Sequence, residues 1–265
     1  MHGNPTTPPP LPGRRLVEQH WRDVLFLHWR VDPARVAPLL PHGTRPDVLG
    51  DATWVGLIPF VLADTRFPPV SPMRRLGTFV EVNVRLYSRD DRGRHGVVFR
   101  TLEAGRLLPV LVARAGWGLP YHWARSSVTR RTDAAGVELD FRSRRHGPGG
   151  PSTRISARLG GPVAANAPDA ELASFLTARW GYHERHLGRT WWARNTHEPW
   201  PLQRAELLEL DDELLAASGL PELAGRAPDS VLASTGVRTA FSRPRPVSAT
   251  AWRWRPAWSG GVVPA

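Results

Sequence analysis

The chain of 265 residues carries a formal net charge of +11 and has no cysteine, which excludes disulfides and thiolate chemistry. All 35 of its basic Lys/Arg positions are arginine, so Schiff-base catalysis by a lysine amine is excluded as well. The sequence contains no run of about 18 apolar residues, which a membrane-spanning helix would need. The first residues do not show the pattern of a secretory signal, so we expect a cytoplasmic protein. The arginines are scattered along the chain, which favours codon bias over an arginine-driven nucleic-acid surface; nucleic-acid binding is kept as a lesser alternative.

The domain organisation is expected to be simple. Residues 1–14 are rich in Pro, Gly and Thr and are expected to form a disordered tail. Residues 15–256 are expected to form one domain, followed by a C-terminal tail at 257–265. Many short strand patterns, Gly/Pro turns and few helical patterns predict a mostly β fold of the α+β type, with helices outside a barrel or sandwich.

The first elements expected along the chain are a helix, a strand and a second helix. Leu16–Arg22 is predicted as a short helix that leads into a strand at Asp23–Val31, which is rich in apolar and aromatic residues. Asp32 and Pro33 are typical of a helix start. Because proline lacks a backbone N–H, Pro38 predicts that this second helix is short or bent.

Phe79–Tyr87 is the most informative of the later strand patterns, because an aliphatic face alternates with a polar face that carries Glu81, Asn83 and Arg85. The other expected strands are Thr53–Val61, Gly96–Leu102, Pro109–Ala115, Ser127–Arg131, Val137–Ser143, Thr153–Leu159, Ala205–Leu210, Val231–Val237 and Val247–Trp252.

The clearest helix is expected from Asp169 to about His186, with Asp169 as its cap and an apolar stripe along one face. His183 and His186 would then lie three residues apart on this helix. Such a pair can share a metal ion, but no third ligand is indicated by spacing, so we expect exposed helix residues and no metal site.

Two groups of polar residues suggest chemistry. Glu81, Asn83 and Arg85 are neighbours on one strand face, where each lies roughly 7 Å along the strand from the next. Inside a barrel they could hold a carboxylate or a polarised carbonyl. A solvent-facing Glu–Arg pair is the alternative. Tyr121 and His122 follow a Gly-Leu-Pro corner and could act as hydrogen-bond donor and proton shuttle, or simply as a packed aromatic and a capping histidine.

The segment His197–Leu202 (HEPWPL) is stiffened by two prolines; a rigid corner that packs Trp200 is expected, and a pocket wall is the alternative. No GxSxG, P-loop, GxGxxG or zinc motif is present, so the sequence predicts neither a cofactor nor a metal.

Five segments follow one another along the chain: HWRVDPARVAPLLPHG (28–43), WVGLIPF (54–60), FVEVNVRLY (79–87), GLPYHWA (118–124) and HEPWPL (197–202). Together and in this order they resemble the YqjF-like family (domain of unknown function 2071), which has no established activity. That family is similar to the acetoacetate decarboxylase-like superfamily. The resemblance therefore implies a partly open, cone-shaped β-barrel with a ligand cavity and flanking helices.

The resemblance to the decarboxylases can be followed at single positions. Arg22 matches a catalytic-site arginine, and Glu81 matches one of two active-site glutamates, whereas the second glutamate is missing. After Pro120, the two positions that hold the Schiff-base lysine and the lysine that lowers its pKa are occupied by Tyr121 and His122. The resemblance thus implies a retained cavity without the decarboxylase nucleophile.

We therefore expect a small-molecule cavity for a carboxylate or oxo-acid, with cofactor-free acid–base chemistry or, alternatively, a non-catalytic ligand-binding or regulatory role. A homo-oligomer is compatible with the sequence. The expected acid–base residues are Glu81, Tyr121 and His122, and the expected substrate-binding residues are Arg22, Asn83 and Arg85.

Overall fold

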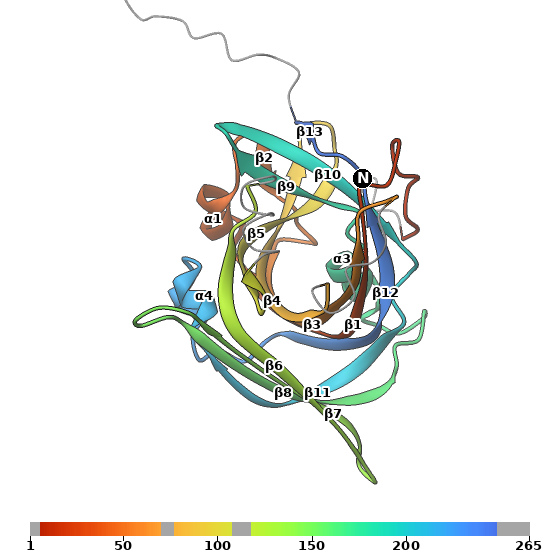
Figure 1. Cartoon of the computed structure of the whole chain (residues 1–265), viewed down its shortest axis with the longest axis vertical. Helices are drawn as coiled ribbons and strands as arrows, with labels where there is room; N and C mark the ends of the chain where they lie inside the picture. Colours follow the sequence, from red (N-terminus) through yellow and green to blue (C-terminus); the bar gives the residue numbers. More distant parts are fainter. Residues whose placement is uncertain (1–5, 70–76, 108–117, 248–265) are drawn as a thin grey trace, which may run out of the picture.

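The computed structural model describes residues 6–69, 77–107 and 118–247, and in these the chain forms one large, curved β-sheet (Figure 1). The strands are β1 (Val17–Val31), β2 (Thr44–Pro46), β3 (Thr53–Arg66), β4 (Phe79–Asp90), β5 (His95–Ala104), β6 (Tyr121–Asp133), β7 (Gly136–Arg145), β8 (Ser152–Pro162), β9 (Gly181–His186), β10 (Arg189–His197), β11 (Leu202–Asp212), β12 (Ser230–Phe241) and β13 (Arg245–Pro246). The helices are α1 (Pro33–Val36), α3 (Ala170–Thr177) and α4 (Leu214–Ala217), with 3-10 turns at Ala37–Leu39 and Pro221–Leu223.

The sheet turns back on itself to form a partial ring. Its strand order is β13-β10-β9-β5-β6-β7-β8-β11-β12-β1-β3-β4-β2, and β5 also pairs with β4 while β10 also pairs with β12. The pairing between β5 and β9 consists of the single residue pair Val97 and Tyr182, so the ring is not a complete barrel. This architecture confirms the expected mostly β fold with few helices.

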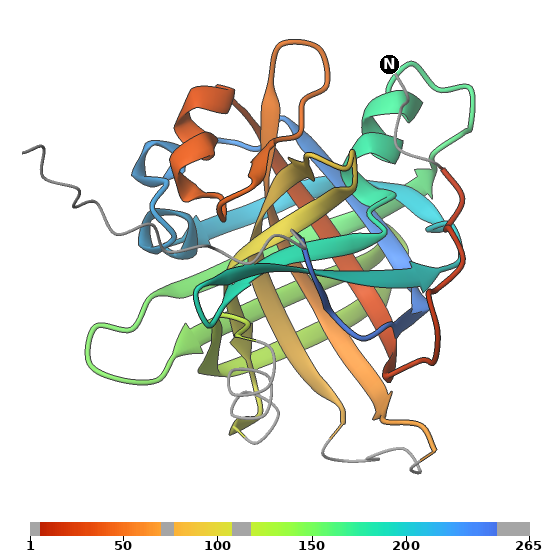
Figure 2. The same cartoon turned by 90° about the horizontal axis from the view of Figure 1, so that it is seen from above.

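Strands β1, β3 and β4 have two buried faces. β6, β7, β8 and β11 lie outside them in Figure 1 and run across them in Figure 2. Between these layers lies the main apolar core, in which Val82, Val84 and Leu86 of β4 pack with Leu139 and Phe141 of β7. The opposite face of β4 carries Glu81, Asn83 and Arg85 towards the inside of the ring, as the alternating pattern predicted.

The first predicted helix is wrong, and the second is confirmed. Leu16–Arg22 lies almost entirely in β1, which begins at Val17 because this segment pairs with β12 on one side and β3 on the other. Asp32 caps α1 by accepting a hydrogen bond from the backbone N–H of Ala34 at 2.8 Å. The α-helix ends at Val36 and continues as the 3-10 turn that contains Pro38.

The long helix expected from Asp169 to His186 is also wrong in its second half. α3 ends at Thr177, and Gly181–His186 forms β9, whose six residue pairs with β10 outweigh the local helical pattern. Asp169 makes no side-chain cap; instead its carboxylate accepts hydrogen bonds from Arg204 at 2.9 and 3.0 Å.

The remaining strand predictions are contained in β3, β4, β5, β6, β7, β8, β11 and β12, apart from two. Pro109–Ala115 lies outside the described residues, as does all of Val247–Trp252 after Val247. In the part of the chain that the structure describes, no helix is long and apolar enough to cross a membrane.

Candidate functional site

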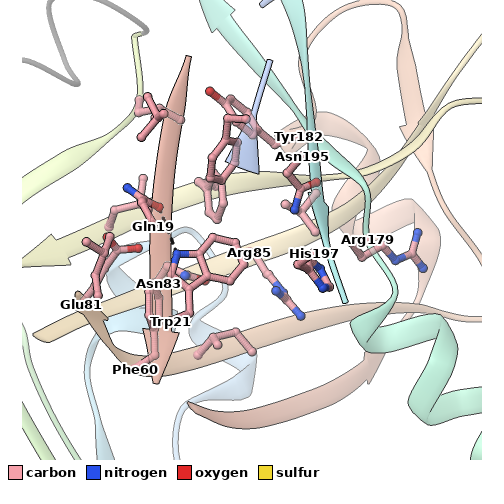
Figure 3. A pocket seen from close by; sticks show the side chains of 18 of the residues that line it. Gln19, Trp21, Phe60, Glu81, Asn83, Arg85, Arg179, Tyr182, Asn195 and His197 are labelled. Carbon is pink, nitrogen blue, oxygen red and sulfur yellow. Dashed lines mark hydrogen bonds between the residues drawn. The ribbon is translucent and has the colours of Figure 1, made fainter. Parts of the chain in front are cut away.

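A partly open cavity of about 270 Å³ lies inside the ring and is lined by residues of β1, β3, β4, β5, β6, β9, β10 and β12 and of the segment that follows α3 (Figure 3). A volume of this size suits a small molecule with a single ring or a short chain. Most of the wall is apolar and aromatic; its large rings are Trp21, Phe26, Phe60, Phe67, Phe79, Phe99, Tyr121, Tyr182, Trp200 and Phe241.

Glu81 and Tyr121 form a hydrogen-bonded pair in this wall. Tyr121 donates its phenolic hydrogen to Oε2 of Glu81 over 2.8 Å. The strand register brings them together, because Leu102 of β5 pairs with Asn83 of β4 on one side and with Tyr121 of β6 on the other. A glutamate expected from its strand pattern and a tyrosine expected from its corner therefore meet at one point of the cavity.

The Glu81 carboxyl group is 2% exposed and lies in an apolar environment. Burial raises the pKa of Glu81 to about 7, against the lowering effect of hydrogen bonds from Tyr121 and Asn83. Burial and the neighbouring Glu81 also raise the pKa of Tyr121, so its phenol stays protonated. Near neutral pH, the protonated and the ionised form of Glu81 are therefore both populated, while Tyr121 remains a donor.

Arg85 brings a positive charge to the cavity. Its Nη2 donates to the hydroxyl of Tyr87 at 3.0 Å and to the carbonyl oxygen of Leu176 at 2.9 Å. The Tyr87 hydroxyl also donates to Leu176 and lies 2.6 Å from Nε2 of His28. Within the described residues, no carboxylate lies within ion-pair distance of Arg85; its guanidinium lies over the rings of Phe26 and Tyr87, 5.7 and 5.5 Å from their centroids.

The C-terminal end of α3 closes this side of the cavity. The carbonyl groups of its last turn, which have no partner within the helix, accept hydrogen bonds from cavity residues. Arg179 donates to Phe175 at 2.7 Å, and the indole N–H of Trp200 donates to Thr177 at 3.1 Å. Unlike Arg85, Arg179 is paired with a buried carboxylate, that of Asp47.

His197 adds a neutral acceptor to the same side. Its Nδ1 lies 2.6 Å from the carbonyl oxygen of Glu198; since a carbonyl only accepts, Nδ1 carries the hydrogen and Nε2 keeps its lone pair. Burial, with a further effect of the Arg85 charge, lowers the pKa of His197 to about 4. The imidazole is therefore neutral at physiological pH. Its ring packs against Trp180 and Trp200, with centroids 4.6 and 5.0 Å away.

Of the six predicted site residues, the structure brings four to the cavity: Glu81, Asn83, Arg85 and Tyr121. Arg22 is exposed and does not line it. Asp23 has a φ of 49°, and this left-handed residue changes the alternation of β1, so that Trp21 and Val24 both face inwards and Arg22 faces outwards.

His122 is likewise absent from the cavity wall, because it follows Tyr121 on β6 and neighbouring strand residues face opposite sides. Sequence reasoning did not single out Arg179, Tyr182 or Asn195 as site residues. His197 and Trp200 both line the cavity, so the HEPWPL segment is a packed corner and a pocket wall at once.

His183 and His186 are strand residues on opposite faces of β9. His183 is fully buried, with Nδ1 2.8 Å from the Ser88 hydroxyl and Nε2 3.3 Å from an Asp90 oxygen. Among the residues that the structure describes, no group of three or more His, Asp or Glu side chains is placed to hold a metal ion.

Comparison with known proteins gives matches in sequence and in structure. The profile of DUF2071, described as an uncharacterized conserved protein, matches residues 18–238. The uncharacterized protein YqjF of Bacillus subtilis (strain 168) is 31% identical over 195 residues, which is 72% of this chain and 76% of that protein.

Two solved structures share the fold at low sequence identity. The enduracididine biosynthesis enzyme MppR with bound HEPES buffer has a TM-score of 0.58 and 15% identity, covering 91% of this chain and 89% of its own. The acetoacetate decarboxylase of Legionella pneumophila has a TM-score of 0.58 and 13% identity, covering 94% and 96%. At these identities the likeness concerns the fold, which is that of the acetoacetate decarboxylase-like proteins.

Proposed function

The chain belongs to the DUF2071 family, and from the chemistry of its cavity we propose that it binds a small carboxylic or oxo-acid there and exchanges a proton with it. The observation that carries this proposal is the presence, in one apolar cavity, of a buried carboxyl group and of an arginine without a protein carboxylate partner among the described residues. Arg85 would hold the ligand's carboxylate, and the aromatic wall would hold its apolar body.

Glu81 is the proposed acid–base residue. Its pKa of about 7 suits a base that removes a proton from carbon next to a carbonyl and later returns it. Tyr121 holds the carboxyl group of Glu81 in place with its hydrogen bond. Chemistry of this kind includes enolisation and dehydration, whereas decarboxylation through a Schiff base has no lysine anywhere in the chain to support it.

The binding test uses short aliphatic and monocyclic aromatic carboxylic and oxo-acids, screened by thermal shift and then by calorimetry. Arg85→Met should weaken binding of the best acid by about ten- to a hundredfold, because a charge-assisted hydrogen bond is lost. Arg100→Met is the matched control: Arg100 also donates to backbone carbonyls, at 3.1 and 3.4 Å, but does not line the cavity. Equal affinity in Arg85→Met and wild type would refute the role of Arg85.

The proton exchange is tested separately by incubating the oxo-acid with the protein in D₂O. We expect loss of its C–H proton signal next to the carbonyl in the presence of wild type, and no such loss with Glu81→Gln, which should still bind. Binding without exchange in wild type would leave the alternative function, a non-catalytic ligand-binding module.

A further inference from the structure

A second pocket of about 200 Å³ lies beside the cavity. It is lined mainly by small and apolar residues of α3 and of the segments that follow β8 and precede β11, among them Val163, Ala173 and Leu202. Two of its lining residues, Thr177 and Trp200, also line the cavity. They therefore form the wall between the cavity and the second pocket, and the indole of Trp200 is the larger part of that wall.

Trp200 is held in this wall by contacts on several sides. Its indole N–H donates to the carbonyl oxygen of Thr177 at 3.1 Å. Its ring stacks on that of Trp21, with centroids 5.9 Å apart and an angle of 16° between the planes. A proline on each side of Trp200 restricts its backbone. The indole is thus fixed as a partition between two apolar spaces.

This partition stands next to Arg85, where the proposed function places the carboxylate. Arg85 and Trp200 donate to neighbouring carbonyl groups at the end of α3, those of Leu176 and Thr177. Both also contact Phe26: the guanidinium lies 5.7 Å from its ring centroid, and the indole ring lies 5.1 Å away, edge to face. The part of a bound acid nearest to Trp200 is therefore the carbon that bears the carboxylate, not the far end of the chain.

We propose that Trp200 determines specificity by excluding acids that carry a bulky substituent on the carbon next to the carboxylate. This inference rests on the proposed function, since it places the carboxylate at Arg85, and it adds which acids of that class are accepted. An unbranched acid extends from Arg85 along the cavity, whereas a substituent on carbon 2 meets the indole. Without the indole, the second pocket joins the cavity and gives such a substituent room.

The test compares 3-phenylpropanoate with its 2-propyl and 2-benzyl derivatives, using calorimetry on the full chain. In wild type we expect 3-phenylpropanoate to bind about tenfold more tightly than either branched acid. In Trp200→Ala the branched acids should gain about tenfold relative to 3-phenylpropanoate, because the second pocket then receives the substituent. Trp200→Leu, which also removes the indole, serves if the alanine variant does not fold.

Phe60→Ala is the matched control, because Phe60 is an aromatic residue of the cavity wall that does not line the second pocket. In the strand register Phe60 pairs with Glu81, whereas Arg85 pairs with Gly56, so the Phe60 ring lies further along the cavity. Phe60→Ala enlarges the cavity away from the carboxylate and should keep the preference for the unbranched acid.

A second substitution separates the proposed role of Trp200 from a general loosening of the cavity. Ser174 of α3 lines the second pocket but not the cavity. When Trp200→Ala is combined with Ser174→Phe, the added ring fills the second pocket, and the gain of the branched acids should be lost again.

Three results overturn this inference and leave the proposed function standing, provided that 3-phenylpropanoate binds. They are equal binding of branched and unbranched acids to wild type, an equal change of both affinities in Trp200→Ala, and a gain that survives the addition of Ser174→Phe. If none of the acids binds, both the inference and the proposed function are overturned.

Discussion

The raised pKa of Glu81 affects the stability of the folded chain as well as the chemistry of the cavity. In the unfolded chain this carboxyl group loses its proton near its ordinary pKa of 4.5, and in the folded chain it does so at about 7. Between these values the unfolded state binds fewer protons, so stability falls as the pH rises through this window, and the loss persists above it. A shift of this size corresponds to about 3 kcal/mol.

Replacing Glu81 by Gln should remove this loss. We measure the free energy of unfolding of Glu81→Gln and of wild type by urea denaturation at pH 4.5 and pH 8. The difference, variant minus wild type, should be about 3 kcal/mol more favourable at pH 8 than at pH 4.5. Glu184→Gln is the matched control: burial raises the pKa of Glu184 to about 8, so stability should change in the same direction, but proton exchange into a bound oxo-acid should persist, because Glu184 does not line the cavity. If the stability of wild type and of Glu81→Gln changed with pH in parallel, the assignment of the raised pKa to Glu81 would be wrong.

At single residues, the sequence predicted correctly which face of a strand a side chain lies on where the alternation of the two faces is unbroken. Glu81, Asn83 and Arg85 could be placed on one face because β4 has no irregularity between them that changes their side. Arg22 was expected at the site from the resemblance to the decarboxylases, but it faces outwards, because the left-handed conformation of Asp23 shifts the alternation of β1. That His197 lines the cavity with Nε2 as an acceptor could not be predicted, because its ring tautomer follows from the contact with the carbonyl oxygen of Glu198.

At the scale of elements, the pairing of β1 with β12 depends on a glycine. Gly236 of β12 pairs with Arg22 of β1 and has a φ of 126°. A Cβ atom at this position would lie 2.0 Å from the carbonyl oxygen of Trp21, which belongs to the backbone and cannot rotate away. The two strands could not keep this spacing with any other residue.

Gly236→Ala should therefore destabilise the fold by about 3 kcal/mol or more, seen as a lower denaturation midpoint. Gly161→Ala provides the comparison, because nothing lies within 4 Å of a Cβ at Gly161 and the residue has no left-handed φ. That variant should be as stable as wild type or slightly more so. A similar effect of both substitutions would show that the close backbone contact between β1 and β12 at Gly236 is not the cause.

Elements formed by neighbouring residues were predictable, whereas those that depend on distant pairing were not. Asp32, Pro33 and Pro38 determine a short helix from within their own segment. The segment from Gly181 to His186 becomes a strand only because β10 lies beside it, and Val17–Arg22 only because β12 and β3 flank it. Local sequence patterns contain no record of such partners.

In the molecule as a whole, the core and the cavity share the same strands. Leu57 and Ile58 are adjacent on β3, yet Leu57 belongs to the main core between the layers and Ile58 lines the cavity. Leu57→Ala should lower the free energy of unfolding by about 2–5 kcal/mol and leave acid affinity unchanged. Ile58→Ala should change acid affinity with a smaller loss of stability, because its side chain already borders open space. Calorimetry measures the acid affinity of both variants, and urea denaturation measures their stability. If the same variant showed the larger loss in both quantities, this separation of core and cavity would be wrong.

The two-faced strands also bear on how the family can diversify. On β3 and β4, one set of positions faces the main core, while the intervening positions line the cavity and belong in part to a second apolar cluster. The two faces of one strand can therefore change with different consequences: substitutions on the core face act on the stability of the fold, and substitutions on the inner face act on the shape and polarity of the cavity.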